Sequence, residues 1–538
     1  MIKKFIDKLL GRDEDGAKAR KAAGPVKARR VEIGPDEHRI DPSLLDERAV
    51  RVVQTLKEAG FEAYIVGGAV RDLLLGVRPK DFDVATNATP EQVKAQFRRA
   101  FIIGRRFRIV HVVHGRGREH EVIEVSTFRA VLDAATAEQV SGNEKTSKSE
   151  LSGKSHVVDA EGRVLRDNVW GPQDEDAARR DFTVNAMYYD PLSQVVVDYF
   201  NGLADARKKV LRMIGDPVAR YREDPVRIVR AVRFAAKLGF AIEPKTRAPI
   251  REMSALLENV PASRLFDEMV KLLQTGHAVK SLAELQTQQL IGRDEKNRPR
   301  GVFPILDAVL DGMARDPQCE RFVQLALQDT DRRVGEDKPV APSFLLACLL
   351  WHEVLGRWQQ IRSQGEAPFP ALQAAIDAVF DARVGDISGR GKLGADMREI
   401  WSMQPRFERR LGNSPFSLIE QPRFRAGFDF LRLRAAVGEV DESLGTWWEE
   451  FSSTNDEIER RALLDAAREA SRKHEPARRV PKVHSVPRAA PAAAGDAAEA
   501  DAATADAAPA KKRRRRRRKP AGEGAAVAAA GGEQHDAD

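Results

Sequence analysis

The segment "PKDFDVAT" places two carboxylates, Asp81 and Asp83, one residue apart. Side chains alternate across a β-strand, so a strand here would point both carboxylates to one face and turn Phe82 and Val84 toward the core. Two like charges this close repel one another unless a cation lies between them. The pair therefore predicts a metal site, although a solvated strand end would show the same pattern.

Two glycines precede those acids in "YIVGGAVRDLLLG", between an apolar strand and a helix. Gly67 and Gly68 would let the backbone approach a ligand, and the N–H groups that follow could hold phosphate. Arg71 lies in the first turns of the same helix and could reach the same phosphates. A plain strand-to-helix turn needs the same glycines. The glycines, the arginine and the paired acids together favour a phosphate cradle beside a metal site.

A second cluster, "ARRDFTVNA", joins Arg179, Arg180 and Asp181 to an apolar run that carries Asn185. The arginines and the acid could form a structural ion pair. They could equally bind a triphosphate and leave Asp181 to work with the metal site or to orient the arginines.

Basic residues recur every three to four positions in "YREDPVRIVRAVRFAAKLGF", at Arg227, Arg230, Arg233 and Lys237. On a helix they occupy about a 120° arc. This spacing is typical of a solvated basic face, which could also bind RNA. Asp224, before a proline, is a suitable N-cap for the helix.

Around these motifs, residues 41–205 alternate short strands with helices, which predicts an α+β head domain built on one sheet. Helix then follows helix, from about residue 206 to residue 475. Residues 1–40 are charged and punctuated by glycine and proline, which predicts a flexible arm. Residues 476–538 are rich in alanine, proline and arginine, and we expect them to be disordered.

The chain carries a net charge of +8, and its tail holds 13 Lys and Arg against 8 Asp and Glu, which accounts for +5 of that charge. A basic balance favours a polyanionic partner. The two cysteines, Cys319 and Cys348, have no zinc spacing and suit a reducing cytoplasm. No apolar run is long enough to span a bilayer, so no stable membrane insertion is expected.

The motifs "YIVGGAVRDLLLG", "PKDFDVAT", "RRDFTVNAMYYD", "RMIGDP" and "REDPVRIVRAVRFAAKLGF" together resemble the class II nucleotidyltransferases of the polymerase-β superfamily. That family contains the CCA-adding tRNA nucleotidyltransferases and the bacterial poly(A) polymerases. The motifs follow the family's order over about residues 64–240. Five such motifs in this order are far more specific than any single one.

The resemblance implies a polymerase-β-like head followed by an all-α neck (residues 206–285), which selects the nucleobase and binds RNA, and an all-α body (residues 286–475), which binds RNA. It implies that Asp81 and Asp83 hold two Mg²⁺ ions. Asp181 matches the family's third acidic position, and Glu124 in "VIEVSTFR" is a rival for that role at the metals.

The resemblance also assigns nucleotide contacts. Gly67, Gly68 and Arg71 would cradle the phosphates, as the glycine turn itself suggests. Asp224 and Arg227 match the pair that hydrogen-bonds the incoming base, so that the protein itself would be the template. The remaining nucleotide-binding candidates are Arg180, Asn185, Arg230 and Arg233.

Within the family, "GRRFRIVHV" and "ARYREDPVR" resemble the poly(A) polymerases, whereas CCA-adding enzymes usually show G-x-x-F-G-T at the first position. We therefore expect AMP transfer from ATP to the 3′ ends of bacterial RNA, promoting RNA processing and decay; CCA addition to tRNA is the alternative. RNA would bind through the basic helical face and the arginine-rich run Lys511–Lys519, and RNA-decay proteins are possible partners. His111 and His114 lie near the site in sequence, but no metal spacing supports them.

Overall fold

The structure, a computed structural model, describes residues 28–104, 108–115, 121–130, 169–383 and 391–473. Between residues 131 and 168 it describes the backbone of three short strands, β7 (Glu138–Gln139), β8 (His156–Val158) and β9 (Val164–Asp167), which form a sheet of their own. The tail predicted for residues 476–538, with its arginine-rich run, lies outside the described residues, as do the first 27 residues of the predicted arm.

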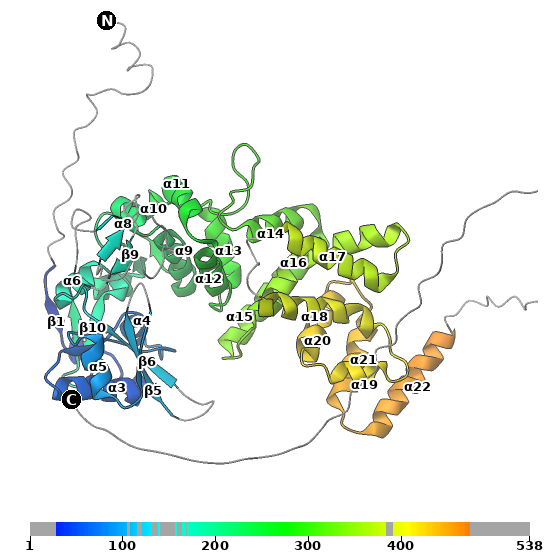
Figure 1. Ribbon diagram of the computed structural model, residues 1–538, viewed down its shortest axis with the longest axis horizontal. Helices are drawn as coiled ribbons and strands as arrows, with labels where there is room; N and C mark the ends of the chain where they lie inside the picture. The colour runs from blue at the N-terminus through cyan, green and yellow to red at the C-terminus, as the bar shows by residue number, and fades with distance from the viewer. Residues whose placement is uncertain are drawn as a thin grey trace, which may run out of the picture. The chain divides into compact units, whose positions relative to one another are not determined.

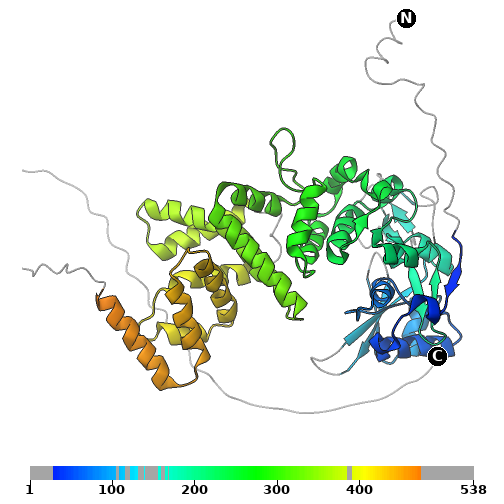
Figure 2. The same ribbon diagram turned by 180° about the vertical axis from the view of Figure 1, so that it is seen from behind.

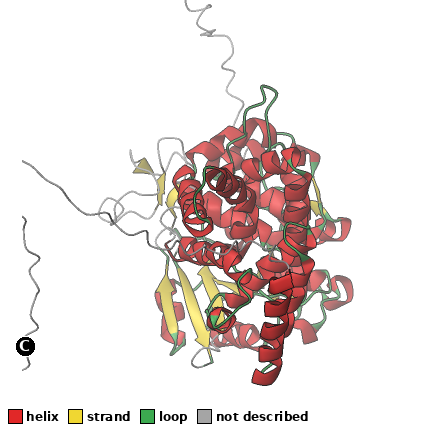
Figure 3. Cartoon of the chain, turned by 90° about the vertical axis from the view of Figure 1, so that its right-hand side faces the viewer, coloured by secondary structure: helices red, strands yellow, loops and turns green. Residues whose placement is uncertain are grey.

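An eight-stranded mixed sheet forms the head (Figures 1 and 3), and its strands run in the order β1-β11-β10-β2-β3-β6-β5-β4. The β3–β6 pair is parallel and every other neighbouring pair is antiparallel. β-Branched residues dominate these strands, as in "IVHVVH" and "VVVD", because they pack well on a pleated surface. The predicted α+β head on one main sheet is confirmed. The strands are β1 (Val31–Ile33), β2 (Ala63–Val66), β3 (Asp83–Thr86), β4 (Ala100–Ile103), β5 (Ile109–His114), β6 (Glu121–Thr127), β10 (Met187–Asp190) and β11 (Val195–Asp198).

Different helices cover the two faces of this sheet. Apolar side chains of α3 (Glu47–Glu58), α4 (Gly68–Leu74) and α5 (Pro90–Gln96) share one core with the inward-facing side chains of the strands. On the opposite face, α6 (Gln173–Ala178) contributes to a smaller aromatic core around Tyr188. Alternation along β3 places Asp83 on the face away from α3 and α5.

The predicted arm is wrong for residues 31–40. β1 pairs with β11 and forms one edge of the sheet, and α2 (Pro35–His38) follows directly. His38 is buried, its Nε2 lies 2.9 Å from the carbonyl oxygen of Gln194, and its ring packs edge-on against Tyr189. Pairing with an exposed strand edge gives this short segment the backbone hydrogen bonds that its own composition does not predict.

The rest of the described chain is helical, as predicted, apart from the short parallel pair β12 (Val210–Leu211) and β13 (Ala241–Ile242). Many of its helices begin with proline in the first turn, where the missing N–H costs nothing. The α-helices are α7 (Gly202–Lys208), α8 (Pro217–Glu223), α9 (Val226–Leu238), α10 (Pro244–Arg247), α11 (Ile250–Met253), α12 (Ala262–Leu273), α13 (Ala278–Thr287), α14 (Pro304–Arg315), α15 (Pro317–Gly335), α16 (Pro342–Ser363), α17 (Pro368–Ala382), α18 (Gly391–Phe407), α19 (Ser414–Ile419), α20 (Phe424–Ala436), α21 (Glu442–Ser453) and α22 (Glu457–Lys473). The 3₁₀ turns are η1 (Pro42–Leu44), η3 (Thr183–Asn185) and η4 (Ser254–Asn259).

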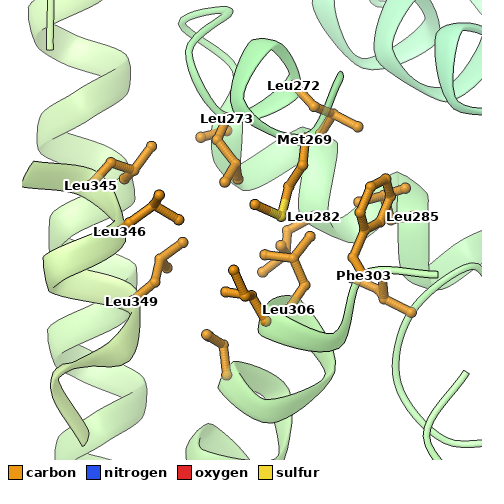
Figure 4. Packing of buried hydrophobic residues seen from close by; sticks show 14 of the residues in the cluster. Met269, Leu272, Leu273, Leu282, Leu285, Phe303, Leu306, Leu345, Leu346 and Leu349 are labelled. Carbon is orange, nitrogen blue, oxygen red and sulfur yellow. The ribbon is translucent and has the colours of Figure 1, made fainter. Parts of the chain in front are cut away.

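One buried apolar cluster extends from Phe182 at the edge of the head to Phe430 in α20. Figure 4 shows its middle, where leucines of α12 and α13 point toward leucines of α14 and α16. Packing therefore continues across residue 285, where the boundary between neck and body is predicted, and that division stays a proposal. The described residues, which end at Lys473, belong to one compact unit.

A second helical core gathers around Phe407, Trp447 and Trp448 and takes in side chains of α18 to α22. Figure 2 shows α22, in orange, as the last helix of the described chain. Both cysteines are free and buried, as their apolar surroundings in the sequence indicate. Among the described helices, none is long and apolar enough to cross a membrane.

Candidate active site

Asp81 and Asp83 flank a buried phenylalanine at the start of β3. Phe82 and Val84 lie in the core beneath the sheet, and both aspartates are exposed. This confirms the alternation predicted from the sequence. Within the described part of the chain, neither carboxylate accepts a hydrogen bond or forms an ion pair.

Glu124 lies directly beside Asp83, because the parallel strands β3 and β6 pair with these two residues in register. The Asp83 carboxyl is crowded by protein atoms, although the residue as a whole is exposed. This crowding, followed by the neighbouring charges of Glu124 and Asp81, raises the pKa of Asp83 to about 6, against the opposing effect of Arg180. The protein thus holds a cluster of carboxylates whose charges are not balanced locally.

The carboxylates of Asp81, Asp83 and Glu124 are chemically suited to bind a divalent cation. Carboxylate oxygens are the ligands that Mg²⁺ prefers, and Mg²⁺ usually takes one or two carboxylates together with substrate phosphates and water. Within the described ranges, no three acidic, histidine or cysteine side chains are gathered tightly enough to form a complete ligand set. Asp81, Asp83 and Glu124 therefore make a partial set.

The glycine turn lies one strand away from Asp83, at the end of β2. Gly67, the N-cap residue of α4, has φ +76°, a conformation that residues with a side chain rarely adopt. A Cβ at Gly67 would come within 3.5 Å of Nη1 of Arg180. The turn and this guanidinium therefore form a cationic surface on the side of Asp83 opposite Glu124.

Arg180 is held in place by two buried side chains that the sequence analysis did not single out. Its Nη2 donates to the Asp176 carboxylate over 3.0 Å, and its Nε donates to the hydroxyl of Tyr188 over 3.3 Å. The same hydroxyl donates to Asp176 over 2.7 Å, and the guanidinium lies over the Tyr188 ring. Tyr188 is distinguishable from any other core tyrosine only through these contacts, so the sequence carried no signal for it.

Arg71 and Asn185 are brought together, but below the surface. The Arg71 side chain is 3% exposed; it donates to Oδ1 of Asn185 over 2.6 Å and pairs with Asp72 over 2.7 Å. In this conformation the Arg71 guanidinium supports the glycine turn from beneath. Its phosphate-binding role stays a prediction.

Asp181 is engaged on both of its oxygens. Oδ1 accepts from the backbone N–H of Phe182 and from the amide of Asn185, and Oδ2 accepts from Nε of Arg230 over 2.9 Å. Burial alone would raise the pKa of Asp181, but the charge and hydrogen bonds of Arg230, aided by Asn185, lower it to about 2. With both of its oxygens engaged, Asp181 is less available than Glu124 to join Asp81 and Asp83 as a third carboxylate.

The predicted solvated basic face of α9 is wrong, because acids on other elements meet its arginines. Arg227 pairs with Glu223 at 2.8 Å, Arg230 with Asp181, and Arg233 with Glu268 of α12 at 3.2 Å. The periodicity was readable from the sequence, but the partners come from separate segments. The face joins α9 to the head and to α12.

Asp224 and Arg227 lie at the start of α9 and act on one another electrostatically. Asp224 also accepts from Arg264 over 2.9 Å, and Arg227 donates to the carbonyl oxygen of Arg220 over 3.0 Å. Asp224 caps α8 rather than α9, because Pro225 is the residue before α9. The Asp224 carboxylate and the Arg227 guanidinium are groups that could hydrogen-bond a nucleobase.

Three further arginines, Arg129, Arg179 and Arg220, enlarge the positive charge beside Arg180. Burial, aided by neighbouring guanidinium groups and opposed by nearby acids, lowers the pKa of Arg129 and of Arg220 to about 10 and that of Arg179 to about 9. Arg220 is already paired with Glu223 at 2.6 Å. The sequence indicated Arg179 through the "RR" pair, but Arg129 follows the end of β6 and Arg220 lies in α8.

Three family models match the chain. One described as "Poly A polymerase head domain" matches residues 63–212, "Probable RNA and SrmB- binding site of polymerase A" matches residues 239–292, and "Polymerase A arginine-rich C-terminus" matches residues 364–483. The run Lys511–Lys519 lies beyond the last match.

Known proteins resemble most of the chain. Poly(A) polymerase I of Haemophilus influenzae is 41% identical over 433 residues, which cover 80% of this chain and 89% of the relative. Poly(A) polymerase I of Escherichia coli is 38% identical over 487 residues, which cover 89% of this chain and 98% of the relative. A CCA-adding enzyme of Lactobacillus helveticus is 37% identical, but over 42% of this chain and 49% of its own length.

Proposed function

The chain belongs to the poly(A) polymerase I family of class II nucleotidyltransferases, and we propose that it transfers AMP from ATP to the 3′ ends of RNA without a template. The 3′ oxygen of the RNA forms a bond to the α-phosphorus of ATP, the bond from that phosphorus to pyrophosphate breaks, and the hydroxyl proton is released. The observation that carries this proposal is the unbalanced acidic group at Asp81 and Asp83, placed between Glu124 and the cationic glycine turn.

Asp81 and Asp83 would hold the two Mg²⁺ ions, with Glu124 as the third carboxylate. Bound there, Mg²⁺ would make the 3′ hydroxyl more acidic and neutralise charge that develops on the pyrophosphate. The carboxylates of this chain fix that position because β3 and β6 are adjacent strands of a rigid sheet.

The triphosphate of ATP would lie against the glycine turn and Arg180. Support comes from Gly67, which has no side chain and whose positive φ favours glycine, and from the Arg180 guanidinium next to it.

Asp224 and Arg227 are proposed to face the adenine. A carboxylate and a guanidinium offer an acceptor and donors to the base edge, and here both are anchored by partners, Arg264 and Glu223. Anchored side chains present a fixed hydrogen-bonding pattern, which is what selection of one base requires. Arg230 and Arg233 would then act as supports of α9.

RNA is proposed to contact the region of residues 239–292 and the arginine-rich tail. The family model over residues 239–292 supports the first contact, and the charge of Lys511–Lys519 supports the second. An RNA-decay protein is a proposed partner on the same family description, and a cytoplasmic location follows from these proposed substrates.

The test is incubation of the full-length protein and Mg²⁺ with an unstructured RNA, and separately with tRNA lacking its 3′ end, offering ATP or CTP. We expect long A-tails on both RNAs and little use of CTP. Asp81→Ala should abolish the extension while leaving the protein folded. Use of CTP with arrest after a few additions would contradict the proposal and support CCA addition.

A further inference from the structure

Three side chains from three neighbouring strands form a row on the face of the head sheet that lies away from α3 and α5. His111 of β5 pairs with Glu124 of β6, and Glu124 pairs with Asp83 of β3. Residues that pair directly across adjacent strands point to the same face, and neighbouring strands lie about 4.8 Å apart. His111, Glu124 and Asp83 are therefore consecutive members of one lateral row.

A hydrogen bond joins the first two members of the row. Nε2 of His111 lies 3.2 Å from Oε1 of Glu124. An ionised carboxylate can only accept, so Nε2 carries the hydrogen and donates. The second oxygen of Glu124 is left available to a ligand on the side of Asp83.

The hydrogen bond from His111 matters because little else holds the Glu124 side chain in place. Its side chain is 52% exposed, whereas that of His111 is 27% exposed. Within the described residues, no other side chain donates to Glu124. A long, half-exposed glutamate would otherwise sample many rotamers and would have to be ordered each time a cation binds.

We propose that His111 is a positioning residue that holds the Glu124 carboxylate toward Asp83, so that a divalent cation meets a third carboxylate already oriented. Hydrogen bonds to a carboxylate ligand commonly fix its direction and tune metal affinity in this way. The inference rests on the proposed function for the identity of the cation site. The residue that this inference adds to the site is His111. A second histidine of the same strand, His114, lies on the opposite face of the sheet.

The test measures Mn²⁺ binding to the full-length protein, without ATP or RNA, from the electron paramagnetic resonance signal of free Mn²⁺. His111→Leu should weaken binding by about tenfold or more. His111→Gln keeps a donor near the Nε2 position and should recover most of that loss. His114→Leu is the matched control: Nε2 of His114 is buried without a hydrogen-bond partner among the described residues, so this variant should bind as the wild type does.

A second arm separates positioning from structure. In a Glu124→Ala background, His111→Leu should cause no further loss of Mn²⁺ affinity, because the carboxylate that it orients is gone. Equal Mn²⁺ binding by His111→Leu and wild type, or additive losses in the double variant, would overturn the inference. Failure of the wild type to extend RNA would refute the proposed function instead, whatever the Mn²⁺ results are.

Discussion

Asp181 in the head and Arg230 in α9 form an ion pair in which both Nε and Nη2 of the arginine donate to one carboxylate oxygen. The Asp181 side chain is 9% exposed and that of Arg230 is 33% exposed. The pair, together with Arg233 and Glu268, ties α9 to the elements on either side of it.

Asp181→Ala should therefore act first on stability. It leaves the Arg230 guanidinium half-buried without its partner, which costs about 3 kcal/mol and should lower the thermal unfolding midpoint by roughly 5 °C or more. A double-mutant cycle with Arg230→Ala should show strong coupling between the two positions. Unchanged stability with complete loss of Mn²⁺ binding would instead place Asp181 at the metal.

Asp83→Asn should stabilise the metal-free protein at neutral pH. The folded-state pKa of Asp83, about 6, is above its ordinary value of 3.8, so holding the charge opposes folding above pH 6 and costs nothing below about pH 4. In the presence of a chelator, the variant should melt at a higher temperature than wild type at pH 7.5, and the difference should shrink as the pH falls from 6 to 4.

Added Mg²⁺ should reverse that order, because it stabilises the form that binds it. The wild type should then gain in melting temperature while Asp83→Asn gains little. A difference between the two metal-free proteins that does not change with pH would show that the charge of Asp83 is not the cause.

Tyr188→Phe should raise the KM for ATP several-fold with a smaller effect on kcat. The change removes the hydroxyl that donates to Asp176 and accepts from Arg180, so the guanidinium beside Gly67 loses one of its two supports. Tyr189→Phe is the control, because its buried hydroxyl has no hydrogen-bond partner in the described structure and its removal should be nearly neutral. Equal kinetic constants for Tyr188→Phe and wild type would mean that Asp176 alone fixes Arg180.

Gly67→Ala should cost activity beyond its cost in stability. An alanine at φ +76° is strained by about 1–2 kcal/mol, and its Cβ would also lie against Arg180. Gly76→Ala carries similar strain at φ +71° but meets nothing within 4 Å. The two variants should lose similar stability, and only Gly67→Ala should weaken ATP binding, measured by equilibrium dialysis; the same loss in both would attribute the effect to strain alone.

The features that could be predicted from the sequence are those that depend on a few residues close together in the chain. Asp81, Phe82, Asp83 and Val84 follow strand alternation, and Gly67 needs only its own backbone conformation. Helical periodicity likewise gives the arc of arginines on α9. These signals depend on residues within one or two turns of each other.

The remainder depends on long-range pairing. The sequence of α9 alone does not predict that Arg230 pairs with Asp181 or that Arg233 pairs with Glu268. Glu124 could be only a candidate until the register of β6 against β3 was known. The pairing of β1 with β11 was missed for the same reason, since it joins segments more than 160 residues apart.

The parallel pairing of β3 with β6 also dictates when the site exists during folding. Parallel neighbours cannot be joined by a tight turn, and here α5, β4 and β5 intervene along the chain before β6 returns beside β3. Asp83 and Glu124 therefore become neighbours only after that crossover has closed, a slow, non-local step. A nascent or partly folded chain displays the "DFD" motif without the assembled carboxylates, so catalytic competence is acquired together with the completed sheet.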